Sequence, residues 1–191
     1  MVEERFRVFL TEYLHTQDVR HRGRDFYTHL KGTYDLLRAW ANPEPICLGG
    51  LFHSIYGTWH FRHKAFPIEN RQAIRSLIGE EAEFLAYVFC VTKRPRAFIA
   101  HIGATNIVLL DHHTNKPLSL TSSELNNLLE IEAANLIEQE GNICAPLQQL
   151  YRADISASAK ATIANYLAKA SMPAVRPGHQ DFVIGSRGNG I

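Results

Sequence analysis

The sequence predicts a mostly α-helical domain with one small β-hairpin. Apolar residues recur with the helical period through most of residues 3–171, and prolines or glycines separate these stretches. Only residues 107–120 show two short apolar segments around a polar turn, the pattern of a hairpin. We expect residues 1–171 to form a single domain. The Pro- and Gly-containing residues 172–191 should form a flexible C-terminal tail.

The helical stretches follow one another along the chain with short connections. The expected helices span about residues 3–17, 25–40, 45–58, 68–78, 80–92, 121–139 and 156–171. The stretch at 45–58 is apolar nearly all round, which is typical of a buried central helix. Thr121 and Glu124 have the spacing of a capping box, so they mark the start of the helix after the hairpin.

Charge and cysteine usage narrow the class of protein. The chain has 20 basic and 19 acidic residues and a formal charge of +1, without the basic excess of a nucleic-acid binder, so no nucleic-acid partner is expected. Its three cysteines form no CxxC pair and suit buried free thiols in a reducing compartment. There is no signal-peptide pattern and no apolar run long enough to cross a bilayer. We therefore expect a cytoplasmic protein without a membrane partner.

Two of the ten histidines fall on stretches that are predicted to be buried. His29 lies on the apolar stripe of the helix at 25–40, and His53 lies 24 residues later in the apolar stretch at 45–58. If that stretch is helical throughout, Gly50 and Gly57 share the face of His53 and let a backbone or a ligand approach its ring. The alternative is that each histidine is a core residue hydrogen-bonded to a carbonyl group.

These residues give the sequence a resemblance to a known superfamily. The motifs are His29-Leu-Lys-Gly-Thr, Leu51-Phe-His-Ser-Ile-Tyr-Gly-Thr, Ile78-Gly-Glu-Glu and Val91-Thr-Lys. Over about residues 21–93 they resemble the N-terminal half of HD-domain metal-dependent phosphohydrolases, most of all the guanosine-tetraphosphate hydrolases. The same strings are similar to a bacterial family of unknown function. The resemblance implies an HD-like orthogonal helical bundle.

The resemblance also implies a divalent metal, iron or manganese, with His29 and His53 as the first two ligands. Ser54 replaces the aspartate of the His-Asp pair, and a neutral hydroxyl is a weak ligand for such a cation. Gly57 and Thr58 stand where the hydrolases have an acidic pair, which argues against guanosine-tetraphosphate hydrolysis. The matching position for the last ligand is Glu132, which would complete a set of two histidines and one carboxylate.

Further residues are assigned to a pocket around the two histidines. His21 and Arg24 precede the His29 helix and could attract an anionic group, although a surface loop is the alternative. Asn135 shares a helical face with Glu132 and Gln139, and this face is either a wall of the site or a solvated side. The complete expected set consists of His21, Arg24, Ser54, Tyr56, Thr58 and Asn135.

Two functional hypotheses follow from these residues. The first is a metal-dependent enzyme, of hydrolase or non-haem iron oxygenase type, which acts on a small molecule. The second is a pseudo-enzyme or ligand-binding module that has kept the HD-like fold without a metal. A homo-oligomer and an interaction role for the tail stay open. Asp111-His112-His113 resembles a metal motif, but adjacent side chains in a hairpin turn diverge, so a polar turn is expected there.

Overall fold

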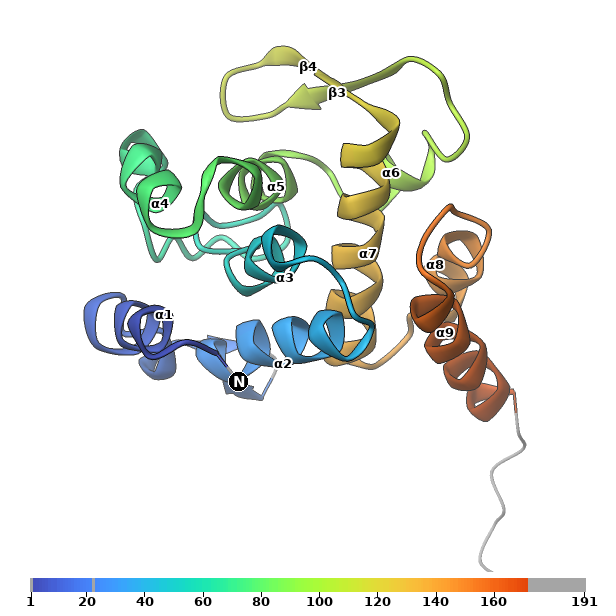
Figure 1. Ribbon diagram of the computed structural model, residues 1–191, viewed down its shortest axis with the longest axis horizontal. Helices are drawn as coiled ribbons and strands as arrows, with labels where there is room; N and C mark the ends of the chain where they lie inside the picture. The colour runs from blue at the N-terminus through green and yellow to red at the C-terminus, as the bar shows by residue number, and fades with distance from the viewer. Residues whose placement is uncertain (1, 22, 172–191) are drawn as a thin grey trace, which may run out of the picture.

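The structure is a computed structural model that describes residues 2–21 and 23–171. It is mostly α-helical with a small hairpin, which confirms the predicted fold class (Figure 1). The expected tail at 172–191 lies outside the described residues. In chain order the elements are α1 (Glu4–Val8), the π-helix η1 (Phe9–Tyr13), the 3-10 helix η2 (Thr16–Asp18), β1 (Arg20–His21), β2 (Arg24–Asp25), α2 (Phe26–Ala39), α3 (Glu44–Leu51), the 3-10 helix η3 (Ile68–Asn70), α4 (Arg71–Ile78), α5 (Glu80–Val91), α6 (Arg96–Ile99), β3 (Ile107–Asp111), β4 (Lys116–Leu120), α7 (Ser122–Gln139), α8 (Cys144–Leu150) and α9 (Ala157–Ala170).

Helix α7 packs against six other helices of the described chain, namely α2, α3, α5, α6, α8 and α9. In Figure 1 it stands upright, with α2, α3 and α5 on one side and α8 and α9 on the other. The predicted capping box at its start is present, because Thr121 and Glu124 exchange hydrogen bonds with each other's backbone. No helix in the described part of the chain has both the length and the apolar character needed to cross a membrane.

Helix α3 occupies the centre of the bundle, against α2, α5 and α7. All its residues from Ile46 to Leu51 are buried, as expected for a central helix. However, α3 ends at Leu51 instead of continuing to residue 58, and a series of turns follows. Gly57 adopts a positive φ of 78° in these turns, a conformation that favours glycine. The expectation that Gly57 and His53 share one helical face is therefore wrong.

Other departures from the expected elements are local. Residues 3–17 form a short α-helix followed by a π-helix and a left-handed bend at His15, not one continuous helix. Residues 20–21 and 24–25 form a second antiparallel pair of very short strands, and α6 and α8 were not expected. The hairpin at 107–120 is confirmed, with Leu109 opposite Leu118 in the register of β3 and β4.

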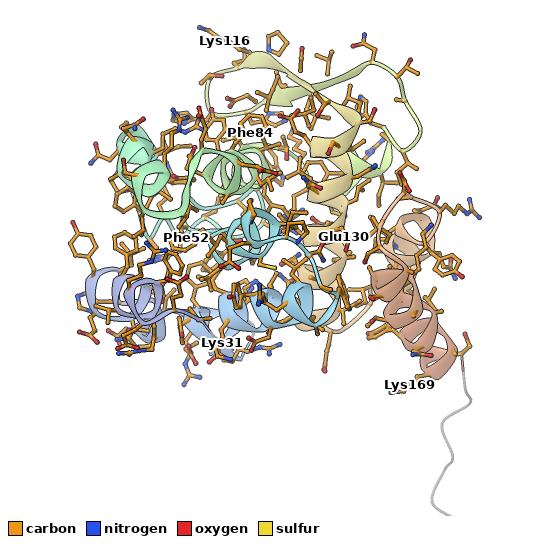
Figure 2. The ribbon with its side chains drawn as sticks, in the orientation of Figure 1. Lys31, Phe52, Phe84, Lys116, Glu130 and Lys169 are labelled. Carbon is orange, nitrogen blue, oxygen red and sulfur yellow. The ribbon has the colours of Figure 1, made fainter. Side chains whose placement is uncertain are left out.

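Side chains fill the space between the helices (Figure 2). Phe52, just after α3, is fully buried and packs edge-on against Phe6 of α1, with ring centroids 6.2 Å apart. Cys47 and Cys90 are buried free thiols, and Cys144 is partly exposed. Burial raises the pKa of Cys47 to about 11 and that of Cys90 to about 12, so neither is a reactive thiolate at neutral pH.

The closest approach between α2 and α3 depends on Gly50. A Cβ atom at this position would lie 2.2 Å from Cδ1 of Leu37, which is fully buried in a closely packed interior. We expect Gly50→Ala to lower the free energy of unfolding by about 1–2 kcal/mol, because overpacking outweighs the gain in helix propensity. Urea unfolding followed by circular dichroism measures this. In a Leu37→Val background the same substitution should cost less, and an equal cost in both backgrounds would contradict the proposed clash.

Candidate functional site

The two histidines meet inside the bundle. The Nε2 atoms of His29, on α2, and His53, just after α3, lie 3.1 Å apart, and both residues are fully buried. Their ring planes are nearly perpendicular, with centroids 5.0 Å apart. The side chains therefore converge as their spacing suggested, although their role in binding stays a prediction.

Hydrogen bonds fix the tautomer of His53. Its Nδ1 lies 2.6 Å from the carbonyl oxygen of Gly50, which only accepts, so Nδ1 carries the proton. Burial lowers the pKa of His53 well below its ordinary value, and the neighbouring His29 lowers it further. His53 is therefore neutral and its Nε2 accepts, so Nε2 of His29 donates the hydrogen bond between the two rings.

Glu138, near the end of α7, completes the buried polar chain. Its Oε2 contacts Nδ1 of His29, while Nη1 of Arg24 lies 2.6 Å from its Oε1. Burial raises the pKa of Glu138 to about 7 against the opposing effect of Arg24. Since His29 uses its Nε2 proton toward His53, the contact between Nδ1 and the carboxyl group needs one further proton, carried by either partner. His21 lies against the same ring, with the centroids of His21 and His29 4.4 Å apart.

Glu132 is committed to a different partner. It is fully buried and accepts from Nη1 of Arg94 at 3.1 and 3.4 Å. Burial raises its pKa, and Arg94 opposes this shift. Asn135 is also fully buried and accepts from Gln139 at 2.7 Å, so the alternative that this face of α7 is solvated is wrong.

The donor set does not fit the metal site that the resemblance implies. Glu132 faces Arg94, and His29 and His53 are the two predicted ligands that touch. Within residues 2–21 and 23–171, no three His, Cys, Asp or Glu side chains are grouped so that they could hold a metal ion. The set of His29, His53 and Glu132 therefore stays a sequence-based prediction.

Two of the predicted pocket residues, Tyr56 and Thr58, line a different pocket from the one beside the two histidines. Tyr56 donates to Glu83 of α5 at 3.0 Å, and the same carboxylate accepts two hydrogen bonds from Arg71. Ser54 is buried, and Thr58 accepts from the backbone N–H of Phe61 at 3.0 Å. Tyr56 and Thr58 line a second pocket, which is described below, whereas His21 and Arg24 do lie beside the histidine pair.

A small cavity opens next to the histidine pair. We call it the His21–Arg94 pocket; it has a volume of about 190 Å³ and is lined by Arg20, His21, His60, Phe61, Arg94 and Gln139. His21 lines the cavity, and its ring lies against that of His29 with the two planes tilted by 30°. Cζ of Arg94 lies 4.4 Å from the ring centroid of Phe89, which packs against His53. The buried pair is thus one side chain away from the cavity.

Sequence reasoning missed Arg94 and Glu138. One signal pointed to Glu138: Gly32 lies one turn after His29 on α2, and a Cβ there would lie 2.7 Å from Cγ of Glu138. A glycine inside a helix costs about 1 kcal/mol relative to alanine, so it indicates close approach of another element. No comparable signal marks Arg94, because its partner lies 38 residues away in the chain.

The comparisons with known proteins identify a matching family. Residues 10–94 match the model of a family described as "Domain of unknown function (DUF6817)". The matched stretch includes both histidines and Arg94 but ends before α7, so Glu132 and Glu138 lie outside it. No curated protein and no solved structure matches the chain. The match is consistent with the expected similarity to an uncharacterised family.

The proton shared by Glu138 and His29 makes stability depend on pH. The pKa of Glu138 is raised from 4.5 to about 7 on folding, so its contribution is full below pH 4.5 and is lost as pH rises through 7. The difference in unfolding free energy between the natural chain and Glu138→Gln should shift by at most about 3 kcal/mol between about pH 5 and about pH 8, with the natural chain losing stability as the pH rises. Urea unfolding across this range measures the difference. Exposed Glu140→Gln is the control, and identical pH profiles for the natural chain and Glu138→Gln would contradict the expectation.

The ion pair between Arg94 and Glu132 is buried on both sides. Arg94→Met would leave the Glu132 carboxylate without its partner, so we expect a loss of roughly 3–5 kcal/mol in unfolding free energy. Adding Glu132→Gln should recover most of this loss, because a neutral amide needs no counter-charge. Chemical denaturation of the single and double variants measures both effects. The surface substitution Arg152→Met is the control, and a cost below about 1 kcal/mol for Arg94→Met would show that the pair is dispensable.

Proposed function

We propose that the protein is a metal-free ligand-binding domain that holds a small anionic molecule in the His21–Arg94 pocket. One observation carries the proposal: Arg20, Arg94, His21 and His60 line a single small cavity, and no carboxylate lines it in the described part of the chain. Guanidinium groups bind oxyanions through paired hydrogen bonds and are the usual choice for such ligands.

The wall of the pocket is rigid, which supports binding. Glu132 and the ring of Phe89 hold the guanidinium of Arg94, and the ring of His29 backs His21. A pre-organised binding group loses little side-chain entropy when a ligand arrives. Behind this wall, the hydrogen bonds between Glu138, His29 and His53 position the pocket and do not contact its contents.

The HD-like assignment and the cellular compartment belong to the same proposal. The contact between His29 and His53 supports a divergent HD-type bundle, since histidines at these positions approach a common site in that superfamily. Unpaired buried cysteines support a reducing compartment such as the cytoplasm.

The geometry of the two imidazoles favours a second candidate, a metal-dependent enzyme of hydrolase or oxygenase type. Two nitrogens bound to one ion at roughly 2.1 Å lie about 3 Å apart at right angles, close to the observed 3.1 Å. The carbonyl oxygen of Gly50 holds Nδ1 of His53 and the Glu138 carboxyl group holds Nδ1 of His29, and such outer hydrogen-bond partners are usual for histidine ligands. Iron or manganese would then bind at His29 and His53 with a further ligand, for which Glu132 would have to leave Arg94.

The proposal predicts saturable binding of inorganic phosphate in the His21–Arg94 pocket. The ring signals of His60 in proton–carbon NMR spectra should shift on titration, and His60→Gln assigns them. Arg20→Gln should weaken binding by about tenfold, because it removes one charge-assisted hydrogen bond. Arg62→Gln, a loop arginine outside this pocket, should leave the affinity unchanged.

Two outcomes would overturn the ligand-binding proposal. The first is the absence of saturable shifts at His60 with phosphate or sulfate. The second is a stoichiometric metal in protein purified without chelators, provided that His29→Gln and His53→Gln each abolish the metal content. This result would favour the metal-dependent enzyme. Thermal unfolding in excess chelator gives an independent measurement, since a metal bound only to the native state raises its stability.

A further inference from the structure

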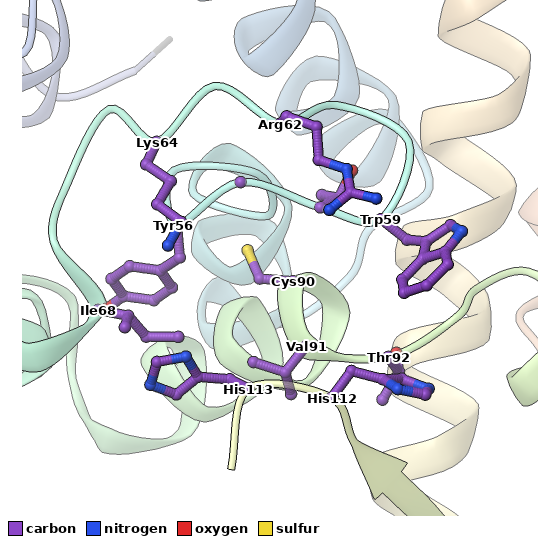
Figure 3. Close-up of a pocket in the computed structure, with 12 residues that line it drawn as sticks. Tyr56, Trp59, Arg62, Lys64, Ile68, Cys90, Val91, Thr92, His112 and His113 are labelled. Atoms are coloured by element: carbon purple, nitrogen blue, oxygen red, sulfur yellow. The ribbon is translucent and has the colours of Figure 1, made fainter. Parts of the chain in front are cut away.

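A second pocket lies on the other side of the loop at residues 57–64. We call it the Trp59 pocket; its volume is about 190 Å³, and it lies between this loop, the end of α5 and the turn after β3. In Figure 3, Arg62 and Lys64 reach in from the loop, His112 and His113 lie across from them, and Cys90 lies between the two groups.

The charge of this pocket is one-sided. Arg62, Lys64, His112 and His113 line it, and no lining residue in the described part of the chain has a carboxylate. The acidic groups nearby are already engaged. Glu83 binds Arg71 and Tyr56, and Asp111 accepts from two backbone N–H groups of the hairpin turn and from Tyr87.

The basic side chains of the pocket have no acidic partner that would neutralise them. Among the described residues, neither Arg62 and Lys64 of the lining nor the adjoining Lys93 lies within 4.0 Å of a carboxylate oxygen. Trp59 holds two of them instead: Nζ of Lys93 lies 4.1 Å and Cζ of Arg62 lies 5.1 Å from its ring. A cation–π contact orients a cation without cancelling its charge. The pocket therefore retains positive charge that an anion would complement.

The loop that carries Trp59, Arg62 and Lys64 is itself fixed. Thr58 binds Phe61 twice, through a backbone N–H donated at 2.6 Å and a hydroxyl that accepts at 3.0 Å. A Cβ at Gly57 would lie 3.0 Å from the carbonyl oxygen of His63, so the chain folds back closely on itself. The backbone that carries these side chains is thus held in place before any ligand arrives.

Besides Thr58 and Thr92, the lining has an apolar part that limits the size of the ligand. Tyr56, Ile68 and Val91 form this part, together with the Cys90 thiol, whose pKa is raised by burial to about 12. A dry cavity of roughly 150 Å³ holds one benzene molecule. A space of about 190 Å³ accordingly accommodates one ring or a short apolar chain with a small charged group.

We propose that the Trp59 pocket binds a small phosphomonoester with an apolar body. The phosphate contacts Arg62, Lys64 and the two histidines of the hairpin turn, and the apolar body contacts Tyr56, Ile68 and Val91. The two cationic side chains, Arg62 and Lys64, match the two negative charges of a phosphate dianion better than the single charge of a carboxylate. This site is separate from the His21–Arg94 pocket and does not depend on the function proposed for it.

Phenyl phosphate is the probe, and Trp59 is the reporter. The chain has two tryptophans, so Trp40→Phe leaves Trp59, which is 43% exposed, as the single fluorescent indole. We expect a saturable change in its fluorescence, and weaker binding of benzoate and of benzyl alcohol. Arg62→Gln combined with Lys64→Gln should weaken phenyl phosphate binding by about tenfold or more. Lys169→Gln on α9 and Arg20→Gln in the other pocket should have no effect.

The proposal is overturned if phenyl phosphate gives no saturable signal, or if the double variant binds it as tightly as the parent. Tighter binding of benzoate than of phenyl phosphate would overturn the ligand class. Arg62 and Lys64 are exposed, so unchanged thermal unfolding of the double variant verifies that any loss of binding is local. If phosphate still shifts the His60 signals in the double variant, the His21–Arg94 pocket is intact, and the loss of binding belongs to the Trp59 pocket alone.

Discussion

The hydrogen bond between His29 and His53 is the contact on which the arrangement of the bundle depends. Two neutral or singly charged imidazoles in a dry interior are costly unless every ring nitrogen has a partner. Gly50 supplies an acceptor for His53 from α3, and the carboxyl group of Glu138 supplies the partner of His29 from the end of α7. Satisfying both rings therefore requires α2, α3 and α7 to meet at one point. The same meeting places Arg24 against Glu138 and His21 against His29.

The two pockets arise from the chain segments that surround this point. In the loop after α3, Trp59 borders one pocket and the neighbouring His60 borders the other. At the end of α5 the arrangement repeats, since Lys93 lies over Trp59 while Arg94 lines the His21–Arg94 pocket. Consecutive residues thus serve different cavities. Glu138 pairs with Arg24 and Glu132 pairs with Arg94, whereas Arg62 and Lys64 of the Trp59 pocket have no carboxylate within 4.0 Å among the described residues.

Much of the fold could be predicted because the patterns that define it are local. The period of apolar residues located α2, α5, α7 and α9, and the capping box located the start of α7. The prediction was wrong where a break carries no strong sequence mark. Phe52 to Tyr56 continue the apolar stretch of α3, yet they form turns. The chain reverses there, and the backbone N–H of Phe66 then donates to the carbonyl oxygen of Ile55. Periodicity identifies an apolar face but not the residue at which a buried helix ends.

The sequence by itself determined the helical class, the hairpin and the two buried histidines, because burial and local hydrogen bonding follow from residue type and spacing. Only the tertiary structure decided which charged groups meet. Glu132 and Glu138 lie on the same helix, six residues apart, yet the first binds Arg94 and the second binds His29 and Arg24. The physical reason is that a buried charge takes whichever partner the packing brings within hydrogen-bonding distance, and that partner can come from any distance along the chain.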